Sequence, residues 1–171
     1  MREELLLYLE SLINEIPHGV YEGLLFTLFL GIILFIAVKG KKSKEGVIVL
    51  ILMEYIFLVY CSTVLFRDVA VYRTYNYTPF WSYNQPEFLT ENLMNILLFI
   101  PIGFFVGGTL KKKHIWNAIG IGFVLSFFIE LTQLITTRGV FNVDDIIHNV
   151  LGCIIGFACF VFCYKMVKRI T

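Results

Sequence analysis

The stretch ELTQLITTRGVFNVDDIIHNVLG, residues 130–152, places carboxyl, carboxamide, arginine and histidine side chains between two long apolar runs. The runs on either side are long enough to cross a membrane as helices, so the polar side chains fall close to the bilayer or within it. A polar group at membrane depth costs several kcal/mol unless it finds a partner. We therefore expect this stretch to join two membrane helices and to carry the functional site.

The remainder of the chain predicts an all-α membrane protein. Of its 171 residues, 58% are hydrophobic and only 16% are charged, whereas soluble domains are about 25% charged. Several apolar segments have the roughly 20 residues that a helix needs to cross the hydrocarbon layer. We predict five spans, at about residues 19–38, 46–66, 92–110, 115–135 and 144–164.

The first 18 residues predict a separate, amphipathic helix. Apolar side chains recur there at helical spacing, at Leu5, Leu9, Leu12 and Ile16. Acidic and amide residues lie opposite them, and Pro17 ends the pattern. Such a helix favours the membrane surface. We therefore divide the chain into an interfacial helix, residues 1–18, and a transmembrane bundle, residues 19–171, and we expect no cleaved signal peptide.

Lysine and arginine placement predicts the orientation. The basic residues of the first and third connections and of the tail are Lys39, Lys41, Lys42, Lys44, Lys111, Lys112, Lys113, Lys165, Lys168 and Arg169. The opposite side has only Arg2, Arg67, Arg73 and Arg138. Because cytoplasmic loops carry the excess of positive charge, the amino terminus is expected outside and the carboxyl terminus in the cytoplasm. All four outer positive residues are arginines, whose planar guanidinium binds carboxylate or phosphate in bidentate fashion.

Three predicted spans carry polar residues at one depth near the outer surface. Helical spacing places Glu130 and Gln133 on one face, since they are three apart, and Asp145 and Asn149 on another, since they are four apart. Asp144 and His148 form a further pair, and Asn92 and Asn95 start the third span. We take Glu130 and Asp145 as candidate catalytic residues. The candidate ligand-binding residues are Asn92, Asn95, Gln133, Arg138, Asp144, His148, Asn149, Arg67 and Arg73.

Structural explanations compete with a functional one. Glu130 or Asp145 could form an internal ion pair with Arg138 that fixes helix register. Asn142 could cap the last helix, whose positive dipole end favours aspartates in its first turn. His148 could be a packing residue. Gly152 and Gly156 continue the Asp145 face and allow a neighbouring helix to approach closely.

Four segments of the chain resemble the VanZ-like family of bacterial membrane proteins. They read YTPFWSY (77–83), ENLMNILLFIPIGFFVGG (91–108), FFIELTQLITTRGVFNVDDIIHN (127–149) and VLGCIIGF (150–157). The resemblance covers roughly residues 47–160. The family's motif positions fall on Asn95, Pro101, Gly103, Glu130, Gln133, Arg138, Asp145, Asn149 and Gly152.

The resemblance implies a small bundle in the bacterial cytoplasmic membrane and an association with resistance to glycopeptide antibiotics, teicoplanin especially. It implies no settled catalytic mechanism. Asn142 departs from the pattern, because an aspartate is frequent there, and this removes one candidate ligand or base. The loop motif is also looser, with Tyr77 and Thr78 before Pro79-Phe80 in place of Leu-Ile.

Three functions remain open at this stage. A polar pocket in the outer leaflet could bind, or also modify, a lipid-linked wall or teichoic-acid-type component. Arg138, alone or with Arg67 or Arg73, would then hold a phosphate. Glu130 and Asp145 would position a sugar hydroxyl or a divalent metal, or act as a base. The same cluster could be the site of a small-solute or proton-coupled transporter. The protein could also act without catalysis by binding a partner, with Gly103, Gly107 and Gly108 as the contact face.

Cofactors and further partners follow from the same residues. No cysteine or histidine pair has zinc-ligand spacing, so we predict no metal site, although carboxyl and amide oxygens would suit Mg²⁺ or Ca²⁺. We expect the lipid bilayer as a partner, no nucleic acid, and an oligomer as an open alternative.

Overall fold

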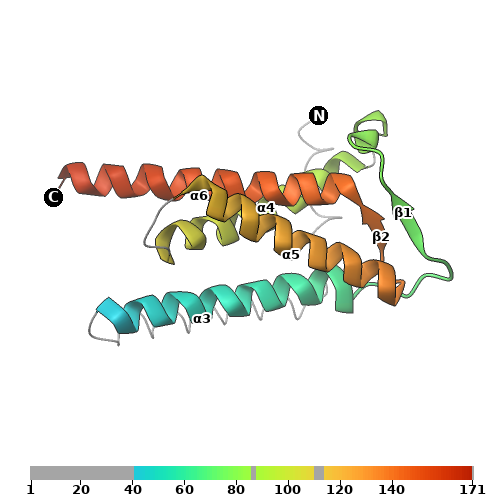
Figure 1. The fold of residues 1–171 in the computed structure, drawn as a ribbon, viewed down its shortest axis with the longest axis horizontal. Helices are drawn as coiled ribbons and strands as arrows, with labels where there is room; N and C mark the ends of the chain where they lie inside the picture. The colour runs from blue at the N-terminus through green and yellow to red at the C-terminus, as the bar shows by residue number, and fades with distance from the viewer. Residues whose placement is uncertain (1–40, 86–87, 110–113, 171) are drawn as a thin grey trace, which may run out of the picture. The chain divides into compact units, whose positions relative to one another are not determined.

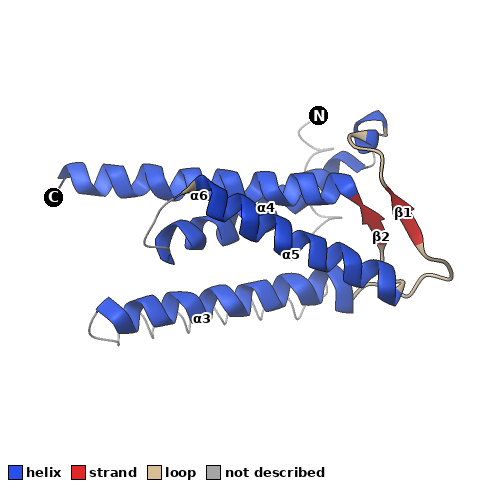
Figure 2. Ribbon diagram, in the orientation of Figure 1, coloured by secondary structure: helices blue, strands red, loops and turns tan. Residues whose placement is uncertain are grey.

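The computed structural model describes residues 41–85, 88–109 and 114–170. These residues are helical apart from two short strands and the loops around them (Figure 2). They fall into two compact units, the first ending at Phe66 and the second beginning at Arg67. The predicted interfacial helix and the first predicted span lie outside the described residues.

The first unit contains α3 (Lys41–Tyr60), which continues as a π-helical turn over Cys61–Leu65. The hydroxyls of Ser62 and Thr63 both donate to the carbonyl of Val59, at 2.9 and 2.8 Å. Hydroxyls bonded to a preceding carbonyl compete with the backbone ladder, and helices often widen or bend where this happens. The apolar part, Glu45–Leu65, matches the predicted span 46–66.

The second unit is built on three long helices: α4 (Leu89–Thr109), α5 (Ile115–Thr136) and α6 (Val143–Ile170). Together with Glu45–Leu65, these give four helices in the described part of the chain that are long and apolar enough to cross a membrane. Figure 1 shows α4 and α5 lying alongside α6. Four of the predicted spans are thereby confirmed as helices, although α6 continues six residues past the predicted end at 164.

Glycines set the close approach of α4 and α6. A methyl group placed on Gly152 would meet the carbonyl of Ile96, and one placed on Gly156 would meet the carbonyl of Ile100. Four residues further along α6, the contact lies four residues further along α4, so these two helices run parallel. Small residues at helix crossings in membranes allow this kind of backbone contact, and Gly152 and Gly156 therefore do what the sequence pattern predicted.

The α4 glycines also face α6. A methyl group on Gly103 would meet the backbone of Cys153, and one on Gly107 would meet the ring of Phe160. The expectation that Gly103, Gly107 and Gly108 present a face to another protein is therefore wrong for the first two positions, because the chain's own last helix covers them.

Two strands of three residues each were not predicted. β1 (Thr74–Asn76) pairs in parallel with β2 (Val140–Asn142), and Tyr75 lies opposite Phe141. The pairing ties the segment before α4 to the connection between α5 and α6, at the end of the bundle away from the carboxyl terminus (Figure 1). A second tie is the hydrogen bond from the N–H of Ala70 to the carbonyl of Thr137 (2.7 Å).

Candidate functional site

Asp144 anchors the segment that precedes α4. Its side chain is completely buried. The carboxylate accepts hydrogen bonds from the N–H groups of Phe80 (2.5 Å) and Ser82 (3.1 Å) and from the Ser82 hydroxyl (2.6 Å). Asn92 of α4 donates its amide to the same hydroxyl at 2.9 Å. We call Asp144, Ser82 and Asn92 the loop anchor, because their polar groups bond one another and the backbone of this segment.

His148 extends the anchor by one helical turn. Its Nδ1 lies 2.6 Å from the backbone carbonyl of Asp144, and its Nε2 lies 2.8 Å from the Tyr83 hydroxyl. A carbonyl can only accept, so Nδ1 carries the proton and, in the neutral ring, Nε2 accepts from Tyr83. His148 is 1% exposed, and both of its nitrogens are used within the chain.

Substitution of Asp144 by asparagine is expected to release this segment. Asparagine has a single acceptor oxygen for the three donors, and its NH₂ group would face N–H groups. We therefore expect the free energy that holds this segment in place to fall by at least about 2 kcal/mol. The measurement is chymotrypsin cleavage at the exposed Phe80 and Tyr83 in detergent, which should accelerate. The neighbouring change Asp145→Asn is the control, because Asp145 makes no bond to residues 80–82; equal cleavage of both variants would contradict the assignment.

Asn142 connects the loop anchor to the two candidate catalytic carboxyls. Its backbone N–H donates to Oε2 of Glu130 (2.7 Å), and its side-chain NH₂ donates to Oδ1 of Asp145 (2.9 Å). Its side-chain oxygen accepts from the N–H of Asp144 and from the indole of Trp81, both at 3.1 Å. The first of these contacts is the helix cap that the sequence predicted.

Glu130 and Asp145, which we call the carboxyl pair, lie close enough for their charges to interact. Glu130 is 2% exposed, and Asp145 is half-buried. The positive charge of Arg67 acts on both, and the negative charge of Glu91 acts on Asp145. The side chain of Asn95 hydrogen-bonds Asp145. α4, α5 and α6 thus each contribute to one polar centre, with Arg67 as its nearby cation.

A second polar layer lies one helical turn deeper. The Asn149 side-chain NH₂ donates to the hydroxyl of Ser126 at 2.8 Å, which joins α6 to α5. Ser126 precedes Glu130 by four residues, and Asn149 follows Asp145 by four. Asn149 is 4% exposed, and its Oδ1 is buried with no hydrogen-bond partner within the described residues. An acceptor in this position is available to a ligand.

The remaining predicted site residues are placed as follows. Gln133 is buried on α5, one turn beyond Glu130. Arg138 donates from Nη1 to the backbone carbonyl of Arg67 (2.9 Å), and so holds the chain that carries the Arg67 guanidinium. Arg73 is exposed, and among the described residues no hydrogen bond or ion pair joins it to this cluster. The binding roles of these residues remain predictions.

The sequence did not single out Ser82, Trp81 or Tyr83, and it treated Asn142 as the loss of a base. Ser82, Tyr83 and Asn142 each bond a candidate site residue, and Trp81 bonds Asn142. Ser82, Trp81 and Tyr83 all lie in the motif YTPFWSY, which entered the sequence analysis only through the family resemblance. Nothing in that motif indicates that its serine reaches an aspartate 62 residues later in the chain.

Comparison with known proteins gives one family. Residues 47–164 match the family VanZ/LLP1. The chain is also 27% identical over 121 residues to Protein VanZ of Enterococcus faecium, a match that covers 68% of this chain and 73% of that protein. No solved structure matches.

Proposed function

The chain belongs to the VanZ/LLP1 family, and on that premise we propose that this multi-pass membrane protein binds the sugar-phosphate headgroup of a lipid-linked envelope component. The observation that carries the proposal is the polar centre of Glu130, Asp145 and Arg67. Carboxyl and carboxamide groups are suited to sugar hydroxyls, and arginine is suited to phosphate. A polar centre near one end of membrane helices would suit a ligand whose tail lies in lipid.

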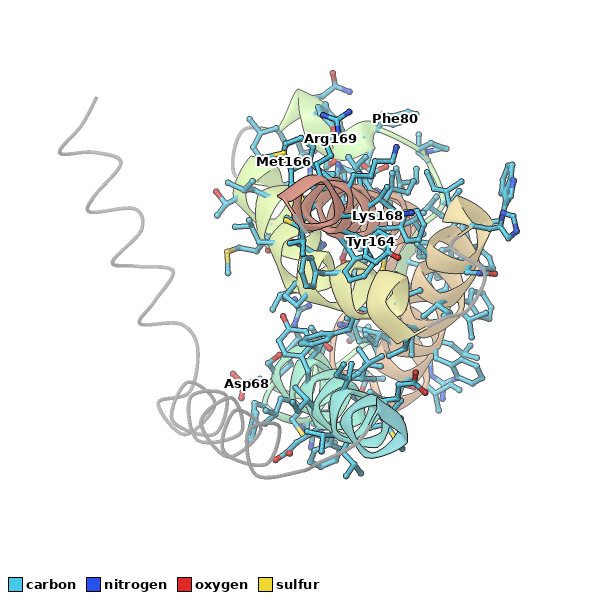
Figure 3. All side chains as sticks on the ribbon, turned by 90° about the vertical axis from the view of Figure 1, so that its left-hand side faces the viewer. Asp68, Phe80, Tyr164, Met166, Lys168 and Arg169 are labelled. Carbon is cyan, nitrogen blue, oxygen red and sulfur yellow. The ribbon has the colours of Figure 1, made fainter. Side chains whose placement is uncertain are left out.

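The orientation proposed from the sequence places this centre toward the outside of the cell. Figure 3 looks down the bundle from the carboxyl-terminal end of α6, where Lys168 and Arg169 lie on its last turn. The carboxyl pair lies toward the other end of α6, in or near its first turn. If the basic end faces the cytoplasm, the carboxyl pair faces the outer leaflet. We further propose that ligand binding underlies a role in glycopeptide resistance.

The arginine that contacts the phosphate is assigned to Arg67. Its charge reaches both members of the carboxyl pair, whereas Nη1 of Arg138 is used on the Arg67 backbone. In this proposal Arg138 is a positioning residue. Glu130 and Asp145 then orient the sugar, and Asn95 orients Asp145.

Titration of a polyprenyl-phosphate-linked sugar into nanodiscs that contain the purified chain tests this proposal. We expect saturable binding, and we expect Arg67→Met to weaken it by about tenfold or more, because a charge-assisted hydrogen bond is lost. Arg73→Met is the matched control: it removes an exposed arginine of the same segment and should leave the affinity unchanged. Native mass spectrometry gives the bound fraction; an equal effect of both changes would mean that only net charge matters.

A further inference from the structure

The carboxyl pair lies among further acidic side chains. Asp145 feels the negative charges of Glu91 and Asp144, and Glu130 feels that of Asp145. The attracting charge on both members of the pair is that of Arg67. A phosphate that approached this centre would meet several acidic side chains, and a cation bound between them would balance its charge.

We propose that a magnesium ion occupies this centre, held by Glu130, Asp145 and the side-chain oxygen of Asn149. That the ion also contacts a phosphate rests on the proposed function; its three protein ligands do not. Asn142 bonds one oxygen of each carboxyl, through its backbone N–H for Glu130 and through its side-chain NH₂ for Asp145. Those bonds fix the orientation of the carboxyls in the manner of outer groups that support metal ligands.

The unused oxygen of Asn149 is the independent observation that points to an ion. A buried amide oxygen is normally hydrogen-bonded, yet Oδ1 of Asn149 has no partner within the described residues, while Nδ2 of the same group is bonded to Ser126. Helical side chains lean toward the amino terminus of their helix. On α6 this direction leads from Asn149 toward Asp145, four residues earlier, and so toward the carboxyl pair.

The chemistry of the donors selects magnesium. All three are hard oxygen ligands, which suit magnesium or calcium and not zinc. Within the described ranges, no three histidine, cysteine or carboxyl side chains converge to hold a metal, so a two-carboxylate site needs the amide. Magnesium is commonly bound by one or two carboxylates together with waters and the phosphates of a ligand, whereas calcium takes six to eight protein and water oxygens. Three protein ligands leave room for a phosphate beside Arg67.

The test uses manganese as a paramagnetic probe for the magnesium site. The purified full chain is placed in nanodiscs of phosphatidylcholine, which has no net charge, and free Mn²⁺ is followed by electron paramagnetic resonance without any lipid-linked sugar. We expect one saturable site, from which Mg²⁺ displaces Mn²⁺. Glu130→Gln and Asp145→Asn should each weaken binding by about tenfold or more, because each removes a charged ligand.

Two substitutions of Asn149 are expected to change the affinity for Mn²⁺ in opposite directions. Asn149→Leu should weaken Mn²⁺ binding by about tenfold, and Asn149→Asp should strengthen it by a similar factor, since affinity rises with ligand charge. Asn117→Leu is the control, because Asn117 lies near the other end of α5, 13 residues from Glu130. Unchanged binding in Asn149→Leu would overturn the assignment of this ligand.

The wild-type titration decides the proposal even if a variant does not fold. Absence of saturable Mn²⁺ binding would mean that a buried water satisfies Asn149, and the magnesium site would be rejected. Mn²⁺ binding without binding of the lipid-linked sugar would reject the proposed function and leave the ion site in place. Sugar binding that is unaffected by chelation would reject the contact between the ion and the phosphate, while the Mn²⁺ titration would still decide whether the ion site exists.

Discussion

Replacement of Gly156 by alanine is expected to lower the stability of the helix bundle by about 3 kcal/mol or more. The added methyl group would occupy the position of the Ile100 carbonyl. A backbone atom in a helix cannot turn aside as a flexible side chain can, so α4 and α6 would have to separate. Separation would loosen the parallel packing that holds Asn95 beside Asp145, and the polar centre would be lost together with the fold.

Gly120→Ala is the matched control for this change. Gly120 also lies inside a membrane helix, but nothing stands within 4 Å of the position its methyl group would take. Alanine is favoured over glycine in helices, so this variant should be more stable by about 0.5–1 kcal/mol. Thermal unfolding in detergent, followed by size-exclusion chromatography, measures both. If both variants shifted the unfolding temperature in the same direction, the packing derived for Gly156 would be contradicted.

If the chain has the proposed role in glycopeptide resistance, replacement of Glu130 by glutamine should abolish the teicoplanin resistance that the chain confers on a susceptible bacterium, with unchanged accumulation in the membrane. Glutamine retains an oxygen that can accept the hydrogen bond from the N–H of Asn142, so the connection after α5 keeps its anchor. It removes the charge through which Glu130 would orient a sugar or an ion. Resistance should therefore fall to the level of cells that carry an empty vector.

Glu130→Leu separates this functional effect from a structural one. Leucine removes the acceptor and leaves the buried N–H of Asn142 unsatisfied, at a cost of about 1–3 kcal/mol. Accumulation of this variant should fall as well as resistance. Immunoblots of membrane fractions, measured beside the inhibitory concentration of teicoplanin, give both quantities. Full resistance in the glutamine variant would show that Glu130 serves only to hold the chain.

Hydropathy and residue spacing were sufficient to predict most of the second unit. The positions of α4, α5 and α6 follow from apolar length, and Glu130 and Asp145 meet because both lie near the same end of neighbouring helices. The end of α6 was misplaced because Lys165, Lys168 and Arg169 lower the hydropathy of its last turns. Without a glycine or proline to stop it, the helix continues through them.

The outer segment could not be predicted in the same way. β1 and β2 have three residues each, too few for an alternating pattern to emerge. The Ser82 hydroxyl finds Asp144 only because the segment turns back at Phe80, a non-glycine residue in the left-handed conformation (φ 62°). No local sequence pattern predicts a hydrogen bond between a donor and an acceptor that are 62 residues apart.

The long separation between Phe80 and Asp144, 64 residues, has a consequence for biosynthesis. At roughly 5–20 residues per second, a ribosome needs on the order of 3 to 13 s to make the intervening chain. During that interval the aromatic segment has emerged but its aspartate does not yet exist. Glu130 is likewise synthesised before Asn142, whose N–H donates to its carboxyl. Ribosomes stalled before residue 142 should therefore display a segment that proteases cut readily, and protection should arise only once the last helix enters the bilayer.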